Sequence, residues 1–132
     1  MHPLFLTLEE VLELHATRIE RYGGSFGVRD PGLLQSALEM PRAMFGGEFL
    51  HEDLFDKASA YLFHLVQNHA FIDGKKRVGL AAALSFLDIN GVEIVADEDA
   101  LTEMVLSVAE GHMNKEAIAE FLRQNASPGE EL

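Results

Sequence analysis

The sequence predicts an all-α fold, a compact bundle of six helices around one central apolar helix. Two observations lead to this prediction. Apolar residues recur at the three- and four-residue spacing of a helix face in successive segments joined by short connections. One segment, 78–89, is apolar on almost every face, which is typical of a helix surrounded by others. The 132 residues fit one domain, which we place at 1–125, followed by a flexible tail at 126–132.

The first helix is expected to begin after Thr7 and to end at the glycine pair 23–24. Thr7 and Glu10 have the spacing of a capping box, in which each side chain accepts a hydrogen bond from the other residue's backbone N–H. The helix-spaced residues that follow are Leu8, Val11, Leu12, His15 and Ile19.

The second helix is expected to begin at the Asp30-Pro31 pair, a cap followed by proline, and to end at Pro41. The next segment, 42–53 (RAMFGGEFLHED), contains glycine and aromatic residues without a helical period. We expect either a surface loop or a short hairpin flap there.

Asp53 is expected to open the third helix, whose core-facing stripe includes Leu62 and Leu65. His69 falls four residues after Leu65, so the same period directs its imidazole inward from the helix end. The fourth helix is expected from Gly74 to about Ile89, and the Asn-Gly pair at 90–91 ends it.

The last two helices are expected to begin at the caps Asp97 and Asn114 and to run through Val108 and Leu122. The segment 92–95 (VEIV) between the fourth and fifth helices is long enough only for a stub of strand.

The chain is strongly acidic, with 10 Lys and Arg against 22 Asp and Glu and a formal net charge of −12. This balance argues against a general nucleic-acid or anionic-membrane binder, since both need a basic face. Cysteine is absent, which excludes disulfides and thiolate metal sites. No signal peptide or membrane-spanning segment is visible, so we expect a soluble cytoplasmic protein.

The stretch 69–79, HAFIDGKKRVG, gathers positive charge at the start of the predicted central helix. A helix amino terminus presents unpaired N–H groups and a partial positive charge. Gly74 permits a tight turn and close approach by a ligand, and Lys75, Lys76 and Arg77 add full charges. These features indicate a phosphate cradle. The alternative is a solvated basic turn without a ligand.

Two further residues in this stretch suggest chemistry. Asp73 precedes the three cations, which suits a site where a divalent metal bridges protein and phosphates, although short acids also cap helices. His69 is a candidate general base for a hydroxyl, and the alternative is a hydrogen-bonded core histidine. Phe71 is interpreted as a packing anchor for the loop.

A base, a metal ligand and a phosphate cradle in nine residues together favour nucleotide-dependent group transfer. The stretch is not a Walker loop, since GxxxxGK[ST] is absent. A zinc site is the competing idea, but His64 and His69 are five residues apart and do not share a helix face. The histidines without comparable context are His2, His15, His51 and His112, and His51 is expected at the surface.

At these residues the sequence resembles the Fic/Doc family, whose core motif reads HxFx[D/E]GN[G/K]R. The matching residues are His69, Phe71, Asp73, Gly74, Lys76 and Arg77. The segments ERYGGSFGVRDPGLLQSALEMP, FGG and LSFLDINGVEI extend the resemblance to the Doc, or death-on-curing, branch over about residues 1–125. Members of this family are all-helical, so the resemblance implies a Fic/Doc-like bundle.

The resemblance also implies an activity. Family members transfer part of a nucleoside triphosphate to a protein hydroxyl, and most Fic proteins transfer AMP. Doc toxins instead transfer the γ-phosphate of ATP to a threonine of translation elongation factor Tu, and a Phd-like antitoxin encoded beside the toxin silences it. A bacterial, cytoplasmic Doc-type toxin using ATP and Mg²⁺ is therefore the leading expectation, with AMP transfer as its alternative.

By resemblance, His69 is the base on the target hydroxyl and Asp73 binds magnesium. The phosphate-binding residues are Gly74, Lys75, Lys76 and Arg77. The loop around 45–49, with Phe45, Gly46 and Gly47, corresponds to the flap that positions the target segment.

Lys75 departs from the family, which has asparagine at this position. Lysine is longer, charged and donor-only. It either pairs with a phosphate in place of the asparagine or forms an ion pair with Asp73 that displaces the metal. The second outcome predicts a catalytically impaired binding module. Gly74 is the Fic-like choice and Lys76 the Doc-like one, so the motif leaves the donor orientation open.

Overall fold

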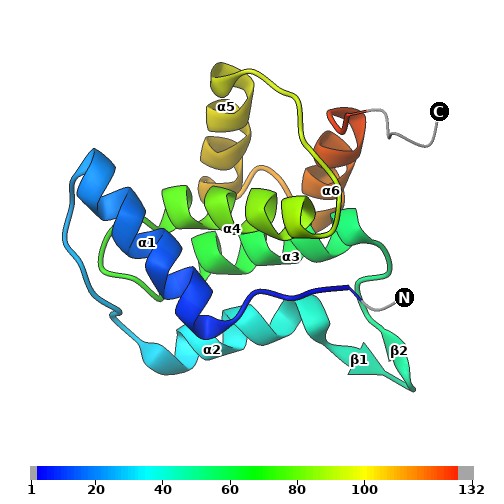
Figure 1. The fold of residues 1–132 in the computed structure, drawn as a ribbon, viewed down its shortest axis with the longest axis horizontal. Coiled ribbons are helices and arrows are strands. Elements are labelled where there is room, and N and C mark those ends of the chain that lie inside the picture. Colours follow the sequence, from blue (N-terminus) through cyan, green and yellow to red (C-terminus); the bar gives the residue numbers. More distant parts are fainter. Residues whose placement is uncertain (1–2, 128–132) are drawn as a thin grey trace.

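A computed structural model of the chain describes residues 3–127. In this part the chain forms six α-helices and one two-stranded antiparallel hairpin (Figure 1), which confirms the all-α fold. The elements are α1 (Leu8–Tyr22), α2 (Pro31–Glu39), a 3₁₀ turn (Met40–Arg42), β1 (Met44–Phe45), β2 (Glu48–Phe49), α3 (Leu54–Gln67), α4 (Lys75–Ile89), α5 (Glu98–Ala109) and α6 (Lys115–Gln124).

The helices begin at the caps that the sequence predicts. The capping box of α1 is formed in both directions, with Thr7 Oγ1 accepting from Glu10 N at 3.1 Å and Glu10 Oε1 from Thr7 N at 2.8 Å. At α2, α3, α5 and α6 a cap side chain accepts a backbone N–H of the first turn, and only α3 repeats the full capping box; these side chains belong to Asp30, Asp53, Asp97 and Asn114. Each cap satisfies a backbone donor that has no partner inside its helix, so local sequence sets these helix starts.

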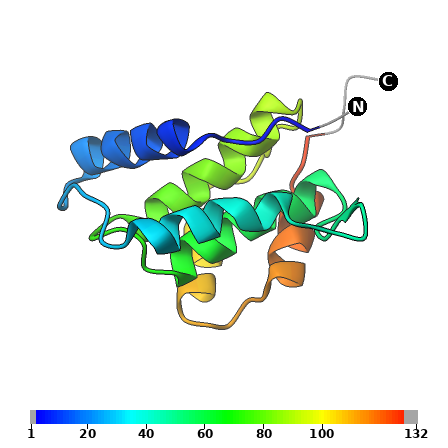
Figure 2. The ribbon, with the colours of Figure 1, turned by 90° about the horizontal axis from the view of Figure 1, so that it is seen from below.

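Helices α3 and α4 lie side by side at the centre of the molecule, and the other helices surround them (Figures 1 and 2). Helix α1 crosses α4, α2 packs along α3, and α5 and α6 cover the opposite side of the pair. The short loop 68–74 joins α3 to α4, so the two run antiparallel. The prediction of a central apolar fourth helix is confirmed.

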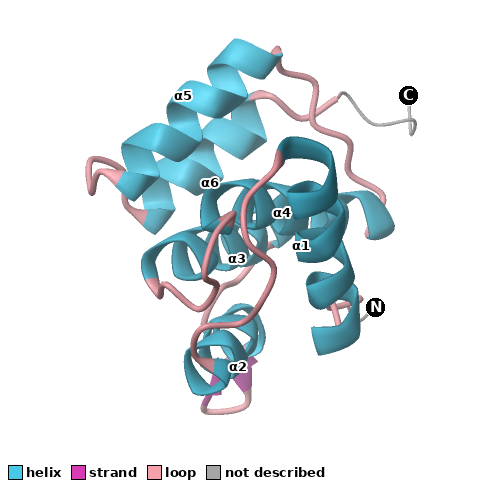
Figure 3. Cartoon of the chain, turned by 90° about the vertical axis from the view of Figure 1, so that its left-hand side faces the viewer, coloured by secondary structure: helices cyan, strands magenta, loops and turns pink. Residues whose placement is uncertain are grey.

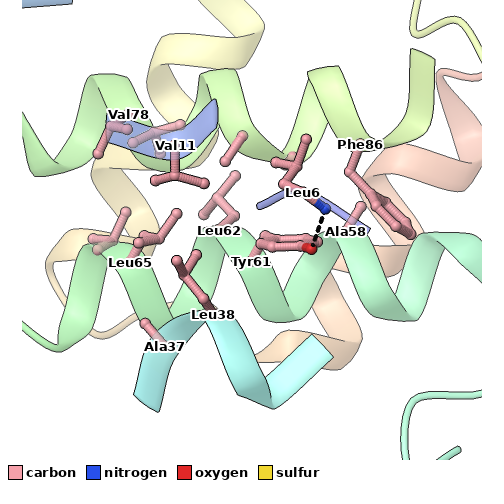
Figure 4. Close-up of a cluster of buried hydrophobic side chains, with 14 of the residues drawn as sticks. Leu6, Val11, Ala37, Leu38, Ala58, Tyr61, Leu62, Leu65, Val78 and Phe86 are labelled. Atoms are coloured by element: carbon pink, nitrogen blue, oxygen red, sulfur yellow. Dashed lines mark hydrogen bonds between the residues drawn. The ribbon is translucent and has the colours of Figure 1, made fainter. Parts of the chain in front are cut away.

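The part of the core drawn in Figure 4 lies between α2, α3, α4 and the amino-terminal segment, and α5 and α6 add further buried side chains to the same core. Its largest fully buried side chains include Tyr61, Phe86, Leu62 and Leu65. At Gly79 the two central helices touch, since an added Cβ would lie 2.8 Å from Cγ2 of Val66. Glycine there lets the amino-terminal half of α4 approach α3 closely.

Tyr61 connects the amino-terminal segment to the core. Its hydroxyl accepts a hydrogen bond from the backbone N–H of Leu6 at 2.9 Å (Figure 4), and its ring packs against Phe86. Burial raises the pKa of Tyr61 to about 12. This buried bond fixes the chain just before α1 begins.

The third helix is shorter than the period of its apolar residues suggests. It ends at Gln67, and His69 has φ of 53°, in the left-handed region. The prediction that the helical stripe directs the His69 side chain inward is therefore wrong, because His69 belongs to the loop and is exposed. A loop conformation, not the helix period, sets the direction of its imidazole.

Two peripheral segments complete the comparison with the sequence. Residues 42–53 contain the short hairpin that was one of the two alternatives. Residues 92–95 form no regular strand, but Ile94 makes an isolated bridge with Ala126, and the N–H of Ser127 donates to the carbonyl of Glu93 at 2.8 Å. The first two residues of the predicted tail are thus tied to the domain, while 128–132 lie outside the described residues.

A group of titratable side chains lies where the start of α6 meets α3. The ammonium of Lys115 is 3.2 Å from Nε2 of His51 and 3.2 Å from Nε2 of His64. Burial and Lys115 lower the pKa of both histidines, that of His64 to about 4, and burial lowers the pKa of Lys115. His51 is half-buried, so its expected place at the surface is wrong. His2 lies outside the described residues.

We expect the free energy of unfolding to fall as the pH is lowered from about 7.5 to about 5. In this range an unfolded His64, with its ordinary pKa of 6.5, binds a proton that the folded protein, with a pKa of about 4, does not bind. Protons therefore favour the unfolded chain. Urea midpoints at the two pH values measure the effect. His64→Gln should reduce the difference between the urea midpoints at the two pH values. Substitution of the exposed His112 by Gln should leave that difference unchanged. Equal pH dependence in both variants would contradict the assignment of the effect to His64.

Candidate active site

The loop 68–74 and the first turn of α4 form one wall of a cleft of about 450 Å³. The lining residues are Arg29, His69, Phe71, Ile72, Asp73, Gly74, Lys75, Lys76 and Arg77. The structure thus brings together the predicted base, the predicted metal ligand and the predicted phosphate-binding residues. Arg29 is the one lining residue from another segment.

The loop between α1 and α2 forms the other wall, and sequence reasoning missed it. This loop passes over the loop 68–74 (Figure 3), and Val28 forms a β-bridge with Phe71. Backbone bonds from Arg29 N to Ala70 O, at 2.8 Å, and from Ile72 N to Gly27 O, at 3.2 Å, fasten the two loops. The sequence feature that could have indicated this wall is Arg29, a cation in a glycine-containing loop of an acidic chain.

His15 is a buried side chain of α1 that contacts two residues of the loop 68–74, Phe71 and Asp73. It is 3% exposed, its ring stacks on Phe71 with centroids 3.9 Å apart, and its Nε2 lies 2.6 Å from the carbonyl oxygen of Asp73. Since a carbonyl only accepts, Nε2 of His15 carries a proton. Phe71 is buried, as expected of a packing anchor. The place of His15 on the apolar stripe of the first helix indicates a buried side chain, but it does not indicate this bond.

His69 stands at the edge of the cleft with an exposed side chain. Its backbone carbonyl accepts a hydrogen bond from Nε of Arg29 at 2.7 Å, which holds the residue in its left-handed conformation. The alternative of a core histidine is therefore wrong for His69.

Asp73 does not cap α4. The cap position belongs to Gly74, and the carboxylate of Asp73 accepts the N–H of Ser25 through Oδ2 at 2.9 Å. Its side chain is exposed at the cleft. Mg²⁺ is usually held by one or two carboxylates together with phosphate oxygens and water, so this single exposed carboxylate at the cleft fits such an ion.

The amino terminus of α4 has free donors. Its first helical hydrogen bond runs from Val78 N to Gly74 O at 2.9 Å, so the N–H groups of Lys75, Lys76 and Arg77 have no partner within the helix. Gly74 has φ of 80°, and a Cβ there would lie 3.0 Å from Cδ1 of Ile19. Only glycine allows this turn without strain.

The cations of the motif point in different directions. Arg77 packs over the ring of Tyr22 and lies 3.4 Å from the carbonyl of Arg18, whereas Lys76 is exposed. Nζ of Lys75 lies 2.7 Å from Nδ1 of His69. Burial and the charge of Lys76 lower the pKa of Lys75. The predicted alternative of an ion pair between Lys75 and Asp73 is wrong for this structure, since the salt bridges of the described residues do not include it.

The structure does not bring Phe45, Gly46 and Gly47 to the cleft. They form the tip of the β1–β2 hairpin, at the end of α3 far from the loop 68–74 (Figures 1 and 2). Helix α3 spans 14 residues, or about 20 Å at the usual rise. Phe45 is 84% exposed. The loop that lies against the cleft is instead the one between α1 and α2.

The same region of the chain matches known proteins. The family model described as Fic/DOC family matches residues 5–87, which include α1 to α3, all but the last two residues of α4, and the whole lining of the cleft. The chain belongs to the Fic/DOC family. Six of the residues at the cleft, from His69 to Arg77, carry the family's motif, and Lys75 is the departure within it.

Two relatives extend this result. The chain is 34% identical to "Protein kinase doc" of Escherichia phage P1 over 116 residues, which cover 88% of this chain and 90% of the relative. It is 49% identical to "Toxin Doc" of Mycolicibacterium smegmatis over 78 residues, which cover 59% of this chain and 60% of that protein. Between residues 3 and 127, no helix has the length and apolar character needed to cross a membrane.

Proposed function

We propose that this member of the Fic/DOC family is a Doc-type toxin that transfers the γ-phosphate of ATP to a hydroxyl of a translation factor similar to elongation factor Tu. The observation that carries the proposal is the meeting of His69, Asp73 and the free N–H groups of α4 in one cleft. The names of the two relatives, a toxin and a protein kinase, support the same activity. Blocking translation would then arrest growth.

In this reaction His69 takes the proton of the target hydroxyl, and the hydroxyl oxygen forms a new bond to the γ-phosphorus. The bond from that phosphorus to the β–γ bridging oxygen breaks, and ADP leaves. The N–H groups of α4 with Lys76 and Arg77 bind the phosphate oxygens and stabilise the charge that develops on them. Asp73 would hold Mg²⁺, which supplies charge neutralisation when bound.

The α1–α2 loop is the candidate for positioning the target segment. It lies directly against the loop that carries His69, through the Val28–Phe71 bridge and the Arg29 bond. Phe26 and Ile72 expose 59% and 54% of their surface on these two loops, which offers apolar contact to an incoming segment. This assignment replaces the hairpin around Phe45.

Labelled ATP separates the two donor orientations. We expect purified protein with Mg²⁺ to transfer label from γ-labelled ATP, and not from α-labelled ATP, to elongation factor Tu. Transfer from the α-label alone would replace phosphate transfer with AMP transfer, the alternative within the family. Absence of transfer from either label would contradict both reactions for this target.

A binding module without turnover is the second candidate function, and the contact of Lys75 with His69 favours it. Under this hypothesis Lys75→Asn should create a transfer activity that the unaltered chain lacks. Equal activity of both proteins would reject it.

We also infer a protein antitoxin of the Phd type as a partner, and a cytoplasmic place of action where translation factors are found. The toxin name of the M. smegmatis relative supports the partner. A short antitoxin-like gene directly upstream of this coding sequence is the expected finding, and co-expression of its product should abolish growth arrest.

A further inference from the structure

His15 on α1 holds one face of the peptide group that joins Asp73 to Gly74. Its Nε2–H donates to the carbonyl oxygen of Asp73 at 2.6 Å, across 58 residues of sequence. The imidazole is buried and stacks on Phe71 with an angle of 14° between the two rings. Because this stacking fixes the plane of the imidazole, it also fixes the direction from which the Asp73 carbonyl receives its hydrogen bond.

The other side of the same peptide group is the N–H of Gly74. The peptide group is trans, so this N–H points opposite to the Asp73 carbonyl and away from the buried imidazole. The hydrogen bonds of residues 3–127 include no acceptor for it. Since Gly74 lines the cleft, its N–H is available to a ligand there.

The backbone around Gly74 has the form of an anion-binding nest. Gly74 has φ of 80° and ψ of 15°, in the left-handed region, and the right-handed helix α4 begins at the next residue, Lys75. Such a reversal of hand turns successive N–H groups toward one concavity that accepts an anion. Here these are the N–H groups of Gly74, Lys75 and Lys76, and the last two have no partner within the helix.

Gly74 does not hold this orientation by itself. Glycine adopts positive and negative φ about equally, so the peptide group could rotate by half a turn. The rotation would take the Gly74 N–H out of the nest and turn the Asp73 carbonyl oxygen, which repels an anion, toward the ligand. It would also leave the buried Nε2–H of His15 without an acceptor, which folded proteins avoid. The His15 bond therefore opposes the rotation.

We infer that His15 is a positioning residue, whose bond to the Asp73 carbonyl keeps the Gly74 N–H in the phosphate-binding nest at the start of α4. The inference rests on the proposed function, because it needs a phosphate ligand in the cleft. It also accounts for the close fit of His15 and Gly74. A Cβ at position 74 would lie 3.4 Å from Nε2 of His15, so glycine leaves room for the imidazole.

The chain allows a direct measurement, because residues 73–74 are its single Asp-Gly pair. Cell-free synthesis with carbonyl-¹³C aspartate and ¹⁵N glycine therefore gives one HNCO cross-peak, which reports the Asp73 carbonyl and the Gly74 amide together. On addition of β,γ-imido ATP with MgCl₂, we expect the Gly74 proton resonance to move downfield as its N–H bonds a phosphate oxygen. This measurement uses the unaltered protein and depends on no variant.

Three variants assign the effect to the His15 bond. His15→Phe keeps a ring that can stack on Phe71 but removes the donor. The downfield shift of Gly74 should then be lost, and the Kd of the analogue should rise by about 10- to 100-fold, as for one hydrogen bond to a charged group. His15→Gln retains an N–H donor and should restore part of both. Val11→Ala removes buried packing one turn earlier on α1 and should change neither.

Binding of the analogue without movement of the Gly74 resonance would overturn the inference even if phosphate transfer is observed. A shift and a Kd that persist in His15→Phe would do the same, and so would equal weakening by Val11→Ala, because loss of packing would then explain the effect. A His15-dependent shift without transfer to elongation factor Tu would retain the inference and reject the proposed target. If the analogue does not bind, both the inference and the proposed function are wrong.

Discussion

Replacing His69 with alanine is expected to reduce the rate of phosphate transfer from γ-labelled ATP by about 10²- to 10⁴-fold, the usual contribution of a general base. The side chain is exposed at the cleft and contributes no core packing, so the variant should fold. Initial rates with labelled ATP and elongation factor Tu measure the effect. Nucleotide binding should persist, because the donors at the start of α4 are unchanged.

His112→Ala is the matched control, since that side chain is 72% exposed and lies outside the lining of the cleft. It should retain the full rate. A His69→Ala protein that transfers phosphate within a factor of about three of the unaltered chain would remove His69 from the mechanism, since general-base catalysis contributes far more than that. Positioning of the nucleotide and target alone would then have to explain the activity.

Replacing Phe86 with alanine is expected to lower the free energy of unfolding by about 3–5 kcal/mol, the range for an aromatic side chain deleted from a core. Phe86 is fully buried, stacks on Phe5 with centroids 5.7 Å apart and packs against Tyr61. Its removal leaves a cavity between α4, α3 and the amino-terminal segment. Urea unfolding monitored by circular dichroism gives the change.

Phe45→Ala is the control of the same residue type, because Phe45 is 84% exposed at the tip of the hairpin. Its free energy of unfolding should change by no more than about 0.5 kcal/mol, as for ordinary surface substitutions. A similar loss of stability in both variants would contradict the central place of α4 in the core. Since α4 also carries the donors proposed to bind phosphate, nucleotide binding by Phe86→Ala should weaken as the fold loosens.

The helical architecture could be predicted because its signals are local. Thr7 with Glu10, Asp30, Asp53, Asp97 and Asn114 each act within one turn of the helix they cap, and the alanines and leucines of 78–89 show a buried helix without reference to other segments. The motif residues from His69 to Arg77 are also close in sequence, so their meeting in one cleft needs only a short loop.

The opposite wall of the cleft could not be predicted in this way. Arg29 is 40 residues from His69 in the chain, and Ser25 is 48 residues from Asp73. Such contacts depend on how α1 and α2 pack against the central pair, and no period or cap in either segment encodes that packing. The same reason explains the missed role of His15, whose place on an apolar stripe predicted burial but not its bond to Asp73.

The sequence by itself determined the six helices, the family and the set of reactive groups, because each depends on residues adjacent in the chain. The tertiary structure alone decided how those groups are arranged. It placed the α1–α2 loop at the cleft instead of the hairpin of Phe45, because the hairpin lies at the far end of α3. It also directed Lys75 toward His69 instead of Asp73, because the carboxylate of Asp73 is already held by the backbone of Ser25 and the left-handed turn at His69 leaves its ring within reach of Lys75.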